Sequence, residues 1–197
     1  FFKQKTAYEI PKRDWSSDVC SSDLNYPVRV TYIGRLDKDS HGLLLMTNNG
    51  DIINKMMRAA NKHEKEYKVT VDKEITEDFL KKMAAGVPIL DTVTRPCTVK
   101  KIGKYTFSII LTQGLNRQIR RMCEALGYEV KDLLRVRVMN ITLDGLKDGQ
   151  YRKLTDQELN ELYDQLKDSS ALPGGKYQEQ WAAAQDNRTR HGKGKKR

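Results

Sequence analysis

One stretch of the chain combines residue types that could do chemistry, Gly34 to Thr47, which reads GRLDKDSHGLLLMT. A polar loop containing Asp37 runs directly into four large apolar residues, Leu43 to Met46, and these predict a short buried strand because breaking residues bound them on both sides. Asp37 is therefore expected just outside the core. A carboxylate there is useful for chemistry only if a neighbouring group keeps it ionised and oriented. Arg35 and a basic cluster far downstream are the candidate neighbours.

Two simpler interpretations compete for this loop. Asp, Lys, Ser and Gly are ordinary turn formers, so the loop could be no more than a turn. Asp37, Asp39 and Gly42 also match positions one, three and six of a calcium-binding loop. However, His41 stands at position five, and Asn48 stands where the bidentate glutamate is needed. The calcium interpretation therefore fails, and the turn interpretation stays open on the residues alone.

Two further stretches carry candidate residues. Residues 63–71 alternate apolar and polar side chains, which predicts a strand with Tyr67 on its apolar side. Residues 113–127 predict a helix that Asn116 caps and Gly127 ends, with one apolar stripe. The arginines of this segment lie off the stripe, and they are Arg117, Arg120 and Arg121. On pattern alone Tyr67 is an ordinary strand residue, and the arginines form either a solvated basic face or an anion site.

Together the three stretches resemble the catalytic motifs of the RsuA/RluB/RluE/RluF family of pseudouridine synthases, and they are most similar to its F type. The matching motifs are Gly-Arg-Leu-Asp with Gly-Leu-Leu-Leu-Met-Thr, Glu-Lys-Glu-Tyr, and Gly-Leu-Asn-Arg-Gln-Ile-Arg-Arg-Met. The resemblance extends from Asn25 to about Asp168. It implies that Asp37 is the catalytic aspartate, that Tyr67 stacks on the target uracil and is a candidate for proton transfer, and that Arg120 pairs with Asp37.

The resemblance also implies an RNA substrate, which basic residues near the motifs are expected to bind. These residues are Arg35, Lys38, Lys65, Arg117, Arg121, Arg135 and Arg137. Arg135 and Arg137 are two residues apart in a strand predicted over residues 134–143, so both are expected on one face. The isomerisation needs no cofactor, and no metal site is expected.

The fold implied by the resemblance is an α+β pseudouridine synthase domain, with a largely antiparallel central sheet, flanking helices and an active-site cleft. The order of elements predicted from periodicity and capping agrees with it. Helices are predicted at residues 49–60, 76–85, 116–127 and 155–166, the last with a capping box formed by Thr155 and Glu158. The main strands are predicted at residues 43–46, 63–71, 105–112 and 134–143.

Three segments are expected along the chain. Residues 1–24 are similar to the translation of sequencing-adapter DNA and have neither helical nor strand period, so we expect a non-native, disordered leader. Residues 25–168 are expected to form the catalytic domain, without the S4-type RNA-binding domain and first strand of the family, which would leave an unpaired sheet edge. Residues 169–197 are expected to be a disordered basic tail, because residues 171–197 hold seven basic and two acidic residues.

Composition limits the classes of molecule to which this chain is expected to bind. The 197 residues include 36 Lys and Arg against 26 Asp and Glu, and the net charge of +10 favours a polyanion such as RNA. Three cysteines without close spacing predict neither a disulfide framework nor a zinc site, and no apolar run is long enough to span a membrane.

We expect a cytoplasmic monomer that isomerises a uridine of large-subunit (23S) ribosomal RNA. A transfer RNA uridine as additional substrate, and a non-catalytic ribosome-assembly factor that binds ribosomal RNA, are the alternatives.

Overall fold

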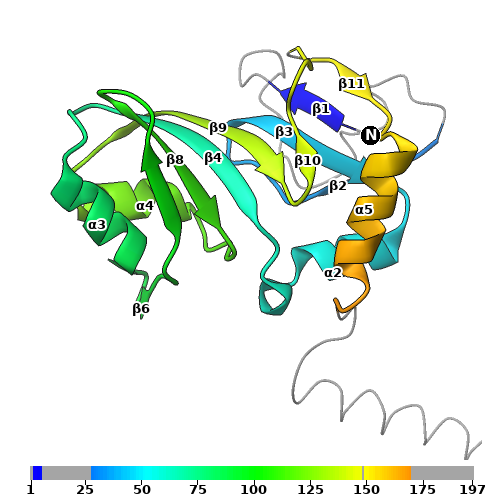
Figure 1. Cartoon of the computed structure of the whole chain (residues 1–197), viewed down its shortest axis with the longest axis horizontal. Coiled ribbons are helices and arrows are strands. Elements are labelled where there is room, and N and C mark those ends of the chain that lie inside the picture. The colour runs from blue at the N-terminus through cyan, green and yellow to red at the C-terminus, as the bar shows by residue number, and fades with distance from the viewer. Residues whose placement is uncertain (1, 6–27, 148, 170–197) are drawn as a thin grey trace, which may run out of the picture.

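The structure, a computed structural model, describes residues 2–5, 28–147 and 149–169. A long nine-stranded sheet crosses the molecule, with helices packed near both of its ends (Figure 1). In spatial order its main strands are β11 (Tyr151–Arg152), β1 (Phe2–Lys5), β3 (His41–Thr47), β9 (Val130–Val138), β4 (Lys65–Val71), β8 (Thr106–Leu111) and β7 (Thr98–Lys101). β2 (Thr31–Ile33) pairs with β3, and β10 (Ile141–Thr142) pairs with β9. Among the described strand pairs only β3 and β9 run parallel, so the predicted α+β fold with a largely antiparallel sheet is confirmed.

The α-helices in the described structure are α2 (Gly50–Met57), α3 (Glu77–Ala85), α4 (Gln118–Ala125) and α5 (Asp156–Leu166), with a 3-10 turn η1 (Ala59–Asn61) after α2. Three of these four, α2, α3 and α5, begin at a residue whose side chain caps them. Asn49 caps α2 by accepting hydrogen bonds from two backbone N–H groups, and Thr76 caps α3 by accepting from Phe79 N at 3.1 Å. α5 has the predicted capping box of Thr155 and Glu158. No helix in the described part of the chain is both long and apolar enough to cross a membrane.

The start of α4 differs from the prediction that Asn116 caps it. Arg117 occupies the cap position with a left-handed backbone, φ 49°, and its side chain makes no cap hydrogen bond. The backbone carbonyl of Asn116 instead accepts a hydrogen bond from Arg121 Nε at 3.1 Å. Gln118 stabilises the turn in place of a cap, since its Oε1 accepts from Leu115 N at 3.0 Å. A buried glutamine therefore orders the chain that leads into α4.

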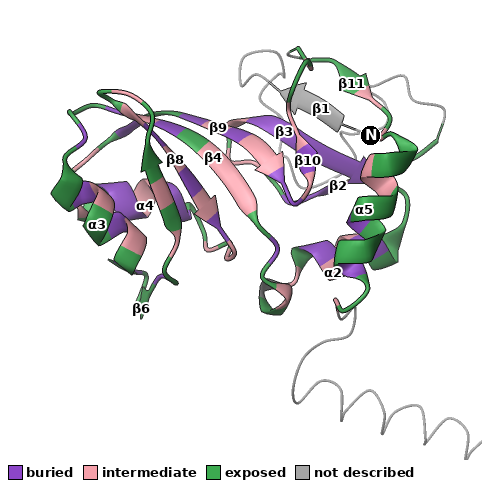
Figure 2. Cartoon of the chain, in the orientation of Figure 1, coloured by how far each residue is buried: buried purple, intermediate pink, exposed green. Residues whose placement is uncertain are grey.

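The two larger of three apolar core clusters in the described structure lie on either side of the molecule's centre. One packs α3 and α4 against β4, β8 and β9, and its most buried members include Val69, Phe79, Met83, Phe107, Ile109 and Met122. The other packs α2 and α5 against β3 and β10, around Leu43, Met56, Ile141, Leu162 and Leu166. Figure 2 shows buried residues on the inward sides of the helices and along β3, whereas β4 and β9 alternate between buried and less buried positions. Met57, the last residue of α2, is 50% exposed.

A β-bulge in β9 overturns the expectation that Arg135 and Arg137 share one face. Glu66 and Tyr67 are consecutive in β4, yet they pair with Arg137 and Arg135, so Val136 is an extra residue on β9. Consecutive residues of a strand point to opposite faces of the sheet. Residues that pair across two neighbouring strands point to the same face. Arg135 therefore lies on the face of Tyr67, whereas Arg137 lies on the face of Glu66, where its Nε donates to Glu66 Oε2 at 2.9 Å.

The expected unpaired edge beside β3 is occupied. Phe2–Lys5, placed by sequence in a leader without structure, form β1 and pair antiparallel with residues 42–45 of β3, and β1 also pairs with β11. Strand pairing uses backbone N–H and C=O groups, which every non-proline residue carries, so an open edge can accept a segment that lacks a strand pattern. The rest of the 1–24 leader, Cys20 included, and the basic tail after Ser169 lie outside the described residues.

Candidate active site

A cleft of about 300 Å³ opens at the middle of the sheet, between the two cores. Its walls come from five segments that are far apart in the sequence: the β2–β3 loop, the end of α2, the start of β4, the loop before α4, and β9. Asp37 lies in the first of these segments and Tyr67 in the third, and both line the cleft. The structure thus brings two of the three predicted catalytic residues to one cavity.

The charges around the cleft are unequal. Five lysine and arginine residues line it, namely Arg35, Arg58, Lys65, Arg117 and Arg135, whereas Asp37 is the one carboxylate among the described lining residues. Such a cleft attracts a polyanion and concentrates positive potential around a single acid. Tyr67 adds an aromatic ring on which a base can stack.

The Asp37 loop is held in place by several contacts. Ser40 N donates to Asp37 O at 3.0 Å and closes a turn at the tip. Beyond the turn, His41 Nε2 lies 2.8 Å from Asp132 Oδ1 of β9. Gly42 then enters β3 with φ 108°, and a Cβ there would lie 2.4 Å from the carbonyl oxygen of Arg135. The approach of β9 to β3 therefore requires glycine at this position.

Arg120 does not form the expected pair with Asp37. Its guanidinium donates instead to the carbonyl of Asp39, at the tip of the same loop, and to Val130 O at 3.2 Å. Among the described residues no ion pair joins the Asp37 carboxylate to an arginine. Arg120 therefore contacts the backbone of the Asp37 loop rather than the Asp37 carboxylate. It is not among the described residues that line the cleft.

The predicted RNA-binding residues divide into two groups. Arg35, Lys65, Arg117 and Arg135 line the cleft, whereas Lys38, Arg121 and Arg137 do not. Arg117 also lies 3.5 Å from the Asp39 carboxylate. Arg137 is removed from the site, because Glu64 and Glu66 bind its guanidinium at 3.0 and 2.9 Å on the other face of the strand.

Arg135 also differs from expectation. Its side chain is 1% exposed, and its Nε and Nη2 donate to Leu43 O at 2.7 Å and Gly34 O at 3.0 Å. A guanidinium enclosed in this way has no surface to offer an RNA phosphate. The bulge turns Arg135 inward, so this geometry gives no support to its predicted contact with RNA, which stays a prediction.

Two neighbours at the cleft have lowered pKa values. Burial, followed by the charge of Arg135, lowers the pKa of Lys65. Burial, followed by the charge of Lys65, lowers the pKa of His63, and Ser169 Oγ lies 3.0 Å from its Nε2. Desolvation disfavours the charged form of each group, and the positive charge of the neighbouring residue acts in the same direction.

Sequence reasoning missed several cleft residues, among them Arg58, Ser40 and Gln118. Arg58 follows the last turn of α2 and has a buried Nε without a hydrogen-bond partner in the described structure, and the buried Oγ of Ser40 is in the same situation. Buried polar groups normally find partners, so these two atoms are candidates for ligand contacts. Gln118, already noted at the start of α4, also lines the cleft. Gln118 stands inside the third motif, but nothing in the local pattern signals Arg58.

Comparisons with known proteins identify the family to which this chain belongs. The RNA pseudouridylate synthase family matches residues 12–125 of the chain. This chain belongs to that family. The match begins inside the stretch expected to be foreign, so the family likeness reaches further toward the N-terminus than the motifs alone indicated.

Individual relatives refine the comparison. The chain is 59% identical over 148 residues to the dual-specificity RNA pseudouridine synthase RluF of Escherichia coli K12, which covers 75% of this chain and 51% of that protein. It is 39% identical over 144 residues to the ribosomal large subunit pseudouridine synthase B of Bacillus subtilis, covering 70% of this chain and 59% of the relative. A crystal structure of a pseudouridylate synthase superposes with a TM-score of 0.72 at 26% identity, covering 82% of this chain and 72% of that one. The chain therefore spans a little over half the length of these curated relatives.

Proposed function

We propose that this chain isomerises a uridine of large-subunit (23S) ribosomal RNA to pseudouridine. The observation that carries the proposal is the meeting of Asp37 and Tyr67 in one cleft whose other charged lining residues are basic. Family membership and the names of the relatives, which include a ribosomal large-subunit enzyme, support the same conclusion.

The reaction balances without any added reagent. The bond between C1′ of the ribose and N1 of uracil breaks, the detached uracil turns, and a bond forms between C1′ and C5. A proton leaves C5 and a proton is gained at N1. Asp37 acts either as the nucleophile at C1′ or as the base that removes a ribose proton. No oxidant, reductant or metal is needed by this scheme.

The cleft suits a nucleotide that has left its helix. Bringing the sugar-base bond to Asp37 requires the base to flip out, at a cost of a few kcal/mol. Stacking on Tyr67 offsets about 1–3 kcal/mol of that cost. Arg35, Arg58, Lys65 and Arg117 are the basic lining residues available for the phosphates beside the flipped nucleotide.

Tritium release tests the proposal. RNA transcripts of the large subunit that carry tritium at C5 of uridine should lose the label to water when incubated with the chain, since the C5 proton departs. Mapping of the modified position by reverse transcription after carbodiimide treatment then identifies the uridine. Binding of ribosomal RNA without any release of tritium would reject the enzyme and favour the assembly factor.

A second RNA class belongs in the same experiment. The Escherichia coli relative is named a dual-specificity enzyme, so transfer RNA transcripts labelled in the same way should be assayed beside ribosomal RNA. We propose ribosomal RNA as the main substrate. Release from transfer RNA alone would overturn that assignment and leave the chemistry intact.

A further inference from the structure

Arg135 presents an unusual combination of charge and burial. Arg135 is 1% exposed, and it is the largest fully buried side chain of the described structure. An isolated buried charge is costly, so a buried guanidinium has to be satisfied by nearby acceptors. Its two hydrogen bonds, at 2.7 and 3.0 Å, both go to backbone carbonyls. Neither carbonyl contributes a counter-charge.

The two carbonyls belong to the two ends of the Asp37 loop. Gly34 immediately follows β2, and Leu43 lies within β3. Arg135 thus ties the beginning of the loop to its end. Arg120 holds the tip through the carbonyl of Asp39, so the loop is fixed at its base and at its tip by different elements.

Backbone features explain how Arg135 reaches this position. Gly42 and Arg135 are partners in the parallel pairing of β3 with β9, and the absent Cβ at Gly42 permits the close approach of the two strands. The extra residue Val136 then places Arg135 on the face of Tyr67. Bulges commonly re-aim a side chain next to an active site.

We propose that Arg135 is a positioning residue for Asp37: by joining both ends of the loop it fixes where the carboxylate lies, and it acts on turnover rather than on RNA affinity. The proposal rests on the isomerase function proposed above. It is consistent with the cleft lining, to which Asp37 and Arg135 both belong. A misplacement of about 1 Å in a reacting group can reduce turnover roughly 100-fold.

Two substitutions test the role. Arg135→Lys keeps the charge but cannot reach both carbonyls in the fixed geometry of a guanidinium, and Arg135→Met keeps approximate volume without charge. We expect kcat to fall about 10- to 100-fold in both, and more in Arg135→Met, while the Kd for ribosomal RNA changes by less than about 3-fold. Hydrogen exchange of the loop amides from Lys38 to Gly42 should accelerate at least about 10-fold in Arg135→Met, under conditions where its melting temperature shows a folded protein.

Arg137→Met is the matched control. It removes an arginine from the same strand, but one that lies on the opposite face and binds Glu64 and Glu66. We expect a lower melting temperature, kcat within about 2-fold of the parent, and unchanged exchange of the loop amides. A control that lost turnover as strongly as Arg135→Met would overturn the proposal, because any lost arginine in β9 would then suffice.

The other outcomes separate the two proposals. Weaker RNA binding with unchanged kcat in Arg135→Lys would show that Arg135 contacts RNA, and lost turnover with unchanged loop exchange would show that it does not act through the loop. Either result overturns the positioning role. If the parent chain itself released no tritium, the isomerase function would fail, yet loop exchange in the two variants would still decide whether Arg135 holds the loop. If Arg135→Met failed to fold, the same measurements on Arg135→Lys would decide.

Discussion

At the scale of single residues, Asp37 differs from the other acidic side chains around the β2–β3 loop. The Asp39 carboxylate lies within 3.5 Å of Arg117, and Asp132 lies 2.8 Å from His41. The described structure gives the Asp37 carboxylate no comparable partner, although it lines the cleft beside Tyr67. A carboxylate left open toward a cavity is available to a substrate.

Asp37→Asn should therefore abolish turnover and leave RNA binding nearly intact. The amide keeps the shape of the side chain but cannot act as nucleophile or base. Tritium release should drop below a few per cent of the parent, with the Kd for ribosomal RNA within about 3-fold, since the phosphate contacts are unchanged. Substantial residual turnover would show that another group performs the chemistry.

Arg117→Ala and Arg58→Ala should instead weaken RNA binding. Both residues line the cleft, and the Nε of Arg58 has no partner in the described structure. Loss of one phosphate contact should reduce the slope of log K against log salt by about 1. Titrations of ribosomal RNA at several salt concentrations measure this slope. Lys100→Ala, at an exposed position on the edge strand β7, is a control that should leave the slope unchanged.

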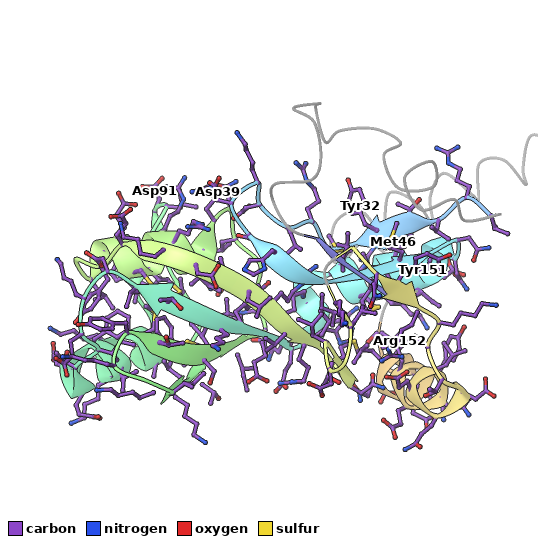
Figure 3. The ribbon with its side chains drawn as sticks, turned by 90° about the horizontal axis from the view of Figure 1, so that it is seen from above. Tyr32, Asp39, Met46, Asp91, Tyr151 and Arg152 are labelled. Atoms are coloured by element: carbon purple, nitrogen blue, oxygen red, sulfur yellow. The ribbon has the colours of Figure 1, made fainter. Side chains whose placement is uncertain are left out.

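At the scale of elements, the β11–α5 junction contributes pH-dependent stability. Hydrogen bonding from Arg152, together with the capping contacts of Thr155, lowers the pKa of Glu158 to about 2. Figure 3 labels Tyr151 and Arg152, the two residues of β11, near α5. A folded-state pKa below the unfolded value of about 4.3 means that the stabilisation is complete above that pH and is lost as pH falls toward 2.

Glu158→Gln should accordingly cost about 1 kcal/mol of unfolding free energy at pH 7, a figure that allows for solvent screening of a partly exposed pair. The difference from the parent should shrink as pH falls from about 4 toward 2, where the parent's carboxylate also becomes protonated. Urea denaturation at several pH values measures both. Glu161→Gln is the matched control on the same helix, because its carboxylate binds the amides of Gln157 and Asn140 rather than an arginine. A pH-independent difference for Glu158→Gln would contradict the ion-pair explanation.

The pairing of β1 with β3 makes a second prediction at this scale. A chain that begins at Asn25 lacks β1, so residues Gly42 to Leu45 lose the antiparallel partner on that side. Amide exchange in this part of β3 should accelerate at least about 10-fold relative to the full chain, because strand hydrogen bonds provide the protection. Residues 65–71 of β4 lie between β8 and β9 and serve as an internal control. Equal protection with and without the first 24 residues would mean that β1 adds nothing to the sheet.

At the scale of the whole molecule, the positive net charge favours attraction to the proposed RNA substrate. The chain has a net charge of +10, and residues 171–197 contribute seven basic minus two acidic residues, or +5. The cleft adds a local excess of basic residues around Asp37. Sequence-independent attraction of this kind is strongest at low salt.

A chain ending at Ser169 should therefore bind ribosomal RNA at least about 10-fold more weakly at low salt, with a shallower salt dependence. The difference should largely disappear at high salt, where screening removes long-range attraction. Thermal unfolding should be unchanged within a few degrees, since the last core contacts of α5 are made by Leu162 and Leu166. Equal binding at low salt would show that the tail does not contribute to RNA attraction.

Much of the fold could be predicted from the sequence alone, because the deciding interactions are local. Asn49, Thr76 and Thr155 cap helices through groups only two or three residues away. The apolar run in β3 and the alternation in β4 likewise determined which elements form, and the motif residues indicated Asp37 and Tyr67 as site candidates. Only their roles remain proposals, to be decided by the substitutions above.

The tertiary structure decided how side chains far apart in the sequence meet. The spacing of Arg135 and Arg137 predicts one face, but the register of β9 on β4 inserts Val136 and sends them to opposite faces. Register depends on pairing across the sheet rather than on local sequence, and a shift of one residue reverses every side chain beyond it. For the same reason no local pattern revealed that Arg58 lines the cleft, that Arg120 reaches Asp39 instead of Asp37, or that β1 pairs with β3. Each of these contacts joins segments that are far apart in the sequence.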